Sequence, residues 1–192
     1  MRIDINTIDK DNVLHYIKIF RDINGESDEV IRKMFDSSDN SNFDNVFCRV
    51  ALVDLIYSTG IQRFNKGGIS CVAHHIVDNS EHIDRLLLKN EIDYDLFNCI
   101  SNVDYSNVSY DNGREAFVKS FASKFLNFSK PEVYPIMDSY VKLALGLPEE
   151  VTYERFCETF ISFKDELEQK CGVFKLKEID MFLWQWSKIH ND

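Results

Sequence analysis

Apolar positions recur at helical spacing along almost the whole chain, separated by short polar or glycine-containing stretches. Residues three or four apart lie on one face of a helix, so this pattern predicts amphipathic helices. The predicted helices cover residues 13–20, 27–35, 46–57, 69–77, 83–88, 93–100, 114–128, 138–145, 152–167 and 176–190. The sequence therefore predicts an all-α protein, with at most a minor strand at its N-terminus.

Glycine, proline and capping residues mark the predicted helix ends. Asn24-Gly25 is expected to end the first helix, and Thr152 is expected to N-cap the long helix that follows it. The last helix is predicted to bury Ile179, Phe182, Leu183, Trp186 and Ile189. A chain of 192 residues can form one helical domain over residues 1–192. A two-lobed arrangement of that domain, with a cleft near residues 113–142, also fits.

The helix predicted over residues 114–128 carries a lysine on its apolar face. Four phenylalanines share that face: Phe117, Phe121, Phe125 and Phe128. Lys124 falls among them, whereas Lys119 points to the opposite side. Burial disfavours the charged ammonium, so a lysine among phenylalanines would hold more of its amine neutral and able to attack an electrophilic carbon. Lys124 is therefore a candidate nucleophile.

A carboxylate follows this helix. Asp138 comes directly after the turn Tyr134-Pro135-Ile136-Met137, where it could orient the amine or stabilise positive charge. A purely structural interpretation stays open for both residues. Lys124 would then lay its methylenes over the rings and extend its ammonium to water. Asp138 would then be the N-cap of the next helix.

Charge narrows the classes of partner. The net charge of −10 argues against a generic nucleic-acid binder, because affinity for phosphate backbones comes largely from Lys and Arg. Residues 113–148 are the one locally basic stretch. They hold three acidic residues against five basic ones, which are Arg114, Lys119, Lys124, Lys130 and Lys142.

Other composition signals concern compartment and cofactors. Five scattered cysteines without CxxC spacing fit a reducing compartment. The N-terminus has no apolar signal core, and no window approaches the length of a membrane span, so we expect a cytoplasmic protein without a membrane partner. His74 and Asp78 have helical spacing but lack a third ligand, and the glycine-containing turns match no phosphate-binding motif. We therefore expect no metal and no cofactor.

Two segments resemble a known family. Ser120-Phe121-Ala122-Ser123-Lys124-Phe125-Leu126, followed by Tyr134-Pro135-Ile136-Met137-Asp138-Ser139-Tyr140-Val141, resembles the catalytic stretch of the helix-hairpin-helix DNA glycosylase superfamily. The Phe-Ala-x-Lys segment is closest to the archaeal 8-oxoguanine glycosylases. The chain also resembles bacterial proteins described as having the 8-oxoguanine glycosylase fold. Those proteins share Leu55-Ile56-Tyr57-Ser58-Thr59, the two segments above, Lys177-Glu178-Ile179-Asp180 and Leu183-Trp184.

The resemblance implies a helix-hairpin-helix glycosylase fold and a chemistry. Lys124 would be the Schiff-base nucleophile that attacks C1′ of a flipped nucleotide, and Asp138 would assist departure of a damaged or modified base. DNA would be the substrate, without a cofactor. The candidate DNA or substrate contacts are Arg114, Lys130, Lys142, Tyr134 and Trp184.

Alternatives stay open on residues and on function. Lys119 matches the lysine-to-aspartate interval of the better-known superfamily members, so it is the alternate nucleophile. Trp184 would stack on a base or partner, or simply pack against a second helix. The acidic charge and the absent Gly-rich hairpin also fit a non-catalytic binding or regulatory protein, in a stress or phage-related context. An enzyme acting on a small nucleoside-like substrate would need the same pocket.

Overall fold

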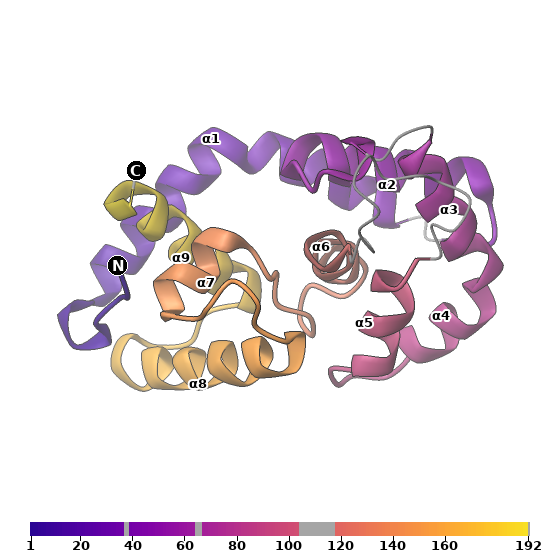
Figure 1. Ribbon diagram of the computed structural model, residues 1–192. Helices are drawn as coiled ribbons and strands as arrows, with labels where there is room; N and C mark the ends of the chain where they lie inside the picture. Colours follow the sequence, from indigo (N-terminus) through magenta and orange to yellow (C-terminus); the bar gives the residue numbers. More distant parts are fainter. Residues whose placement is uncertain (37–38, 64–66, 104–117, 192) are drawn as a thin grey trace. The chain divides into compact units, whose positions relative to one another are not determined.

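The computed structural model describes residues 1–36, 39–63, 67–103 and 118–191, and the regular structure of these residues is entirely helical (Figure 1). The all-α prediction is confirmed. In the described residues the α-helices are α1 (Lys10–Asp36), α2 (Phe43–Tyr57), α3 (Gly68–Asp78), α4 (Ser80–Leu87), α5 (Tyr94–Ser101), α6 (Lys119–Ser129), α7 (Ser139–Leu145), α8 (Tyr153–Cys171) and α9 (Leu176–Asn191). Two 3₁₀ turns, η1 (Ile5–Thr7) and η2 (Ile61–Arg63), complete the set. The minor strand predicted at the N-terminus is wrong, because η1 occupies that place.

The chain forms two compact units. The first combines Met1–Glu26 with Pro131–Asp192, and the second is Ser27–Lys130. The predicted single domain with two lobes stays a prediction. Its cleft near residues 113–142 lies partly outside the described residues.

In the first unit, α7 packs on α9 (Figure 1). The N-terminal segment joins this pair, because the amide of Ile3 donates to the carbonyl of Ala144 at 2.9 Å. Phe182 of α9 contacts Tyr16 of α1 and Phe163 of α8. As predicted, the last helix buries its apolar face, except that Ile189 is about half exposed at the helix end.

In the second unit, α2 packs on α3 and on α6, and α5 packs on α6. The buried face of α2 carries Val46, Val50 and Val53, whose spacing follows the helical period. Asp54, near the end of α2, fixes the segment that follows this helix. Its carboxylate accepts from the amides of Ile61 at 2.8 Å and Gln62 at 2.9 Å, so η2 is tied to the helix before it.

One predicted break is absent. α1 runs unbroken through Asn24-Gly25, where the sequence pattern predicted a helix end. A glycine inside a helix costs about 1 kcal/mol relative to alanine, which a long packed helix can bear. Burial of Val13 and Ile17 on one side of Gly25, and of Ile31 and Phe35 on the other, outweighs this local preference. Within the described stretches, no helix combines the length and apolar character needed to cross a bilayer.

Candidate functional site

Helix α6 is buried around its whole circumference over two turns. The buried residues form an unbroken run: Phe121, Ala122, Ser123, Lys124, Phe125, Leu126, Asn127 and Phe128. A helix at the surface buries one face only, and polar groups in a buried helix cost free energy unless they find partners. The described helix begins at Lys119, with Val118 as its N-cap. Residues 114–117 of the predicted helix, including Arg114 and Phe117, lie outside the described residues.

Lys124 is the most buried lysine side chain on this helix, with only 1% of its surface exposed. Its Nζ donates to Ser120 Oγ at 2.7 Å, one helical turn earlier. The same Nζ lies 5.7 Å from the centroid of the Tyr57 ring, within the range of a cation–π contact. The structural alternative in which the ammonium extends into water is therefore wrong. The lysine is held inside the protein by named partners.

Tyr57 connects Lys124 to a carboxylate of its own unit. The Tyr57 hydroxyl donates to Asp28 Oδ1, on the part of α1 that belongs to the second unit. Phe128 of α6 packs edge-on against the Tyr57 ring at 5.7 Å between centroids. Neither Asp28 nor a functional role for Tyr57 was predicted from the sequence. The available signal was that Tyr57 belongs to the segment Leu55-Ile56-Tyr57-Ser58-Thr59, which the resembling bacterial proteins share.

Aromatic rings and a second buried cation surround the neighbouring turn of α6. Phe35 lies 5.0 Å from Phe125 and 5.6 Å from Phe128, measured between ring centroids. The guanidinium of Arg49 lies over Phe35 at 5.2 Å and over Phe125 at 5.6 Å. On α6, Phe125 therefore contacts the Arg49 guanidinium and Lys124 contacts the Tyr57 ring. All four residues belong to the second unit.

Arg49 is itself 1% exposed and incompletely bonded. Its Nη2 donates to the carbonyl of Asp39 at 3.1 Å, while Nη1 has no hydrogen-bond partner. Burial lowers the pKa of the Arg49 guanidinium, and the carboxylates of Asp84 and Asp39 oppose that shift. Sequence reasoning missed Arg49. The signal was available, because the residue sits between Val46 and Val50 on the apolar face of α2, as Lys124 does on α6.

Asp138 belongs to the first unit and serves as the N-cap of α7. Its carboxylate accepts from the amide of Tyr140 at 3.0 Å, and the side chain is half-buried. Tyr134 is fully buried in the turn before it. Tyr153 of α8 donates to the carbonyl of Pro135 at 2.9 Å and so fixes that turn. The capping role predicted as the structural alternative for Asp138 is confirmed.

The predicted DNA or substrate contacts that the structure describes are engaged within the protein. Lys142 donates to the carbonyl of Glu149 at 2.8 Å. Trp184 is half-buried against Phe20 and Tyr140, and the Lys188 ammonium lies 4.7 Å from its ring centroid. The packing alternative for Trp184 is therefore the one observed. Lys119, the alternate nucleophile, is half-buried in the first turn of α6.

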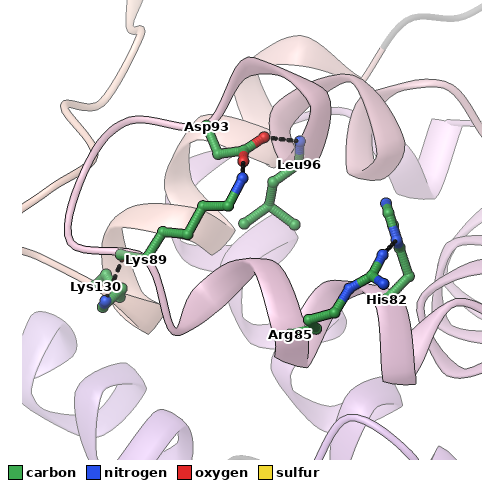
Figure 2. A network of polar contacts seen from close by, with 6 residues as sticks. All are labelled: His82, Arg85, Lys89, Asp93, Leu96 and Lys130. Atoms are coloured by element: carbon green, nitrogen blue, oxygen red, sulfur yellow. Dashed lines mark hydrogen bonds and ion pairs between the residues drawn. The ribbon is translucent and has the colours of Figure 1, made fainter.

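Lys130 belongs to a polar network at the ends of α4, α5 and α6 (Figure 2). Its Nζ donates to the carbonyl of Lys89 at 2.7 Å, and Lys89 pairs with Asp93 at 2.5 Å. Asp93 also accepts from the amide of Leu96 and caps α5. The hydrogen bond to Lys89 lowers the pKa of the Asp93 carboxyl. The network stabilises the helix ends, and the amines of Lys89 and Lys130 are engaged in its ion pair and hydrogen bond.

Among the residues that the structure describes, no three His, Cys, Asp or Glu side chains gather as a metal-binding group. A shallow cavity of about 560 Å³ lies in the first unit between η1 and α8. Arg155 and Glu158 on its wall pair with each other at 3.0 Å. Most of the lining is exposed, and neither Asp138 nor Trp184 contributes to it.

Fold and site together define an all-α protein that buries a lysine beside a tyrosine. Residues 12–133 match the HI_0787_N family, described as an N-terminal domain, and the chain belongs to that family. The chain is also similar to an uncharacterized protein of Haemophilus influenzae. The two are 27% identical over 162 residues, which cover 78% of this chain and 70% of the relative. No solved structure matches the chain.

Proposed function

We propose that this protein is a DNA glycosylase-like enzyme that excises a damaged or modified base. Lys124 would be the nucleophile and Asp138 would assist departure of the base. The observation that carries the proposal is the burial of Lys124. Burying a lysine side chain costs free energy, so a lysine with 1% of its surface exposed is a candidate functional residue. The resemblance of the segments around Lys124 and Asp138 to glycosylases adds the reaction class.

In the proposed reaction, the Lys124 nitrogen forms a bond to C1′ of a nucleotide extruded from the stack. The bond between C1′ and the base breaks as the new bond forms. The departing base takes that electron pair together with a proton, and the amine releases one proton. The bond between C1′ and the sugar-ring oxygen then breaks as the nitrogen lone pair forms a double bond to C1′. The ring oxygen keeps the electron pair of the broken bond and takes a proton to become a hydroxyl, which leaves an imine between Lys124 and the opened sugar. Asp138 would stabilise positive charge at the sugar while the base leaves.

The proposal includes DNA as the substrate, a cytoplasmic location and the glycosylase fold. The described candidate contacts would reach DNA only after losing interactions within the protein. The packing would be lost at Tyr134 and Trp184, and the hydrogen bonds at Lys130 and Lys142. Arg114 lies outside the described residues. Lys119 remains the alternate nucleophile, since it opens the same helix.

Trapping with borohydride tests the nucleophile directly, because reduction turns an imine between lysine and sugar into a stable bond. Duplexes carrying a panel of oxidised or modified bases are incubated with the protein and borohydride. We expect a covalent adduct with the natural protein and with Lys119→Ala, and none with Lys124→Ala. An adduct lost in Lys119→Ala but kept in Lys124→Ala would assign the alternate nucleophile. No adduct and no base release with any lesion would refute the proposal.

Asp138 needs a test that separates catalysis from capping. Asn is as good an N-cap as Asp, whereas Ala costs about 1 kcal/mol of stability at such a position. We therefore expect Asp138→Asn to keep the melting temperature while base release falls at least about a hundredfold, or about 2.7 kcal/mol in activation free energy. Asp138→Ala should lose both. Unchanged base release in Asp138→Asn would limit Asp138 to its capping role.

Two observations favour a second candidate, a non-catalytic binding or regulatory protein. The chain carries a net charge of −10, and the side chains of Lys130 and Lys142 are bonded to backbone carbonyls. This alternative predicts that a folded Lys124→Ala protein retains every cellular phenotype of the natural one. Loss of a phenotype in that variant, with an unchanged melting temperature, would contradict it.

A further inference from the structure

Asp28, Tyr57 and Lys124, all residues of the second unit, are linked by successive contacts. Asp28 lies on α1, Tyr57 is the last residue of α2, and Lys124 lies on α6. We infer that Tyr57 is a positioning residue for the Lys124 amine and that Asp28 acts through Tyr57. The inference deepens the proposed function and takes its chemical meaning from it, because it concerns the same amine.

The contacts of Lys124 restrict its amine from two directions. Ser120 Oγ accepts from Nζ at 2.7 Å, and the Tyr57 ring lies at 5.7 Å from the same atom. A cationic amine over an aromatic face is attracted by the negative charge of that face, and more strongly where water is excluded. An unrestrained lysine side chain has several rotatable bonds, whereas this one is held along a defined direction. Positioning of this kind raises the rate of a reaction by fixing the attacking atom.

Tyr57 is in turn held by two contacts. Its hydroxyl is anchored on the Asp28 carboxylate, and its ring is packed edge-on by Phe128. A hydrogen bond to an ionised acceptor is roughly twice as strong as a neutral one, so the anchor fixes the direction of the ring. A phenylalanine at position 57 would keep the ring and lose the anchor. A leucine would lose both.

The backbone beside Tyr57 is also constrained. Ser58 ends α2 in the left-handed conformation, with φ of 49°. The buried Asp54 carboxylate then accepts from Thr59 Oγ1 and from the amides of Ile61 and Gln62. The turn after Tyr57 therefore has little freedom. Such supporting contacts are what a precisely placed side chain requires.

Nuclear magnetic resonance of lysine side chains tests the inference without any DNA. Protons above an aromatic ring resonate upfield, so the Lys124 ε-methylene signal should lie upfield of the other lysines. Comparison with Lys124→Ala assigns the signal. We expect Tyr57→Phe to keep most of the upfield shift, Asp28→Ala to reduce it, and Tyr57→Leu to abolish it. Tyr16→Leu, a half-buried tyrosine of the first unit, is the matched control and should leave the signal in place.

Trapping rates on a reactive lesion then separate this inference from the proposed function. We expect the rate to fall at least tenfold in Tyr57→Leu and only about threefold in Tyr57→Phe, with melting temperatures measured for both. A Lys124 signal that is unaffected by Tyr57→Leu would overturn the inference. The Lys124 signal could respond to the variants as expected while the natural protein traps no DNA. That outcome would support the positioning of Lys124 by Tyr57 and refute the proposed function. Equal rates in natural protein and Tyr57→Leu would overturn the positioning role even where trapping occurs.

Discussion

Helix α6 and helix α8 carry three phenylalanines each, but the other side chains that they bury differ in polarity. The buried residues of α8 are Tyr153, Phe156, Cys157, Phe160, Phe163, Leu167 and Cys171, which form one stripe. Its charged residues lie outside that stripe, and some of them pair with each other, as Lys164 does with Glu168 at 2.8 Å. α6 buries Ser123, Lys124 and Asn127 together with its phenylalanines.

The choice of buried side chains on α8 is explained by stability alone, whereas the choice on α6 is not. An apolar stripe with paired charges opposite is what a helix at the surface needs. A buried lysine contributes less to stability than an apolar side chain of the same size would. The difference indicates that α8 is built to hold its unit together, and that α6 also carries polar groups for another reason. Four measurements test this difference between α6 and α8.

Removing one central phenylalanine from each helix gives the largest expected effect. Phe125→Ala and Phe160→Ala should each lower the free energy of unfolding by about 3–5 kcal/mol, since both rings are fully buried. Phe125→Ala should cost about 1 kcal/mol more, because the Arg49 guanidinium loses an aromatic contact. Denaturant unfolding measures both losses. Equal losses would show that the buried cation adds nothing to the packing of α6.

Thiol reactivity probes the apolar packing of α8. Burial raises the pKa of the Cys157 thiol to about 12, whereas Cys48 on α2 is exposed. The thiolate is the reactive form, so at pH 8 iodoacetamide should modify Cys157 at least about a hundredfold more slowly than Cys48. Mass spectrometry of peptides follows each site. Both sites should react alike in denaturant, and rapid modification of Cys157 in the folded protein would show that α8 opens locally.

Replacing a lysine by methionine compares the two helices at matched volume. Lys124→Met should leave the free energy of unfolding unchanged or raise it by about 1 kcal/mol, because an apolar side chain is cheaper to bury. Lys164→Met should lower it by up to about 1 kcal/mol, because the partly exposed pairs with Glu168 and Asp165 are lost. Denaturant unfolding is again the measurement. A loss of about 3 kcal/mol or more in Lys124→Met would make Lys124 a structural ion.

The smallest effect depends on pH. The hydrogen bond from Lys164, helped by the amide of Phe174, lowers the pKa of the Glu168 carboxyl. A lowered carboxyl pKa adds stability above the unfolded value, and that stability is lost as pH falls through the folded value. Glu168→Gln should therefore cost roughly 0.5–1 kcal/mol at neutral pH and progressively less below about pH 4.5. Melting temperatures across pH 3–7 check this, with the exposed Glu166→Gln as the control. A constant difference across that range would exclude the ion pair as its source.

The predictability of the candidate site differed between its residues. Lys124 was found because a single charged residue interrupted an apolar stripe, and Arg49 shows the same signal on α2. Asp28 was not found, because an aspartate in the first turn of the helix predicted over residues 27–35 looks the same whether it faces water or a tyrosine. Its role depends on which helices pack together, which helical periodicity does not specify.

The helices, most of their ends and the acidic character of the chain could be predicted from the amino-acid sequence. Periodicity and capping are local properties, so Thr152 and Asp138 were readable as caps from their neighbours alone. Tertiary packing fixes the conformation and the burial of a residue where its local sequence preference points the other way. It carried α1 through Gly25, because buried contacts on both sides outweigh a glycine's cost of about 1 kcal/mol. It also enclosed α6 on every side, which turned a lysine at the edge of a stripe into a buried amine held by Ser120 and Tyr57.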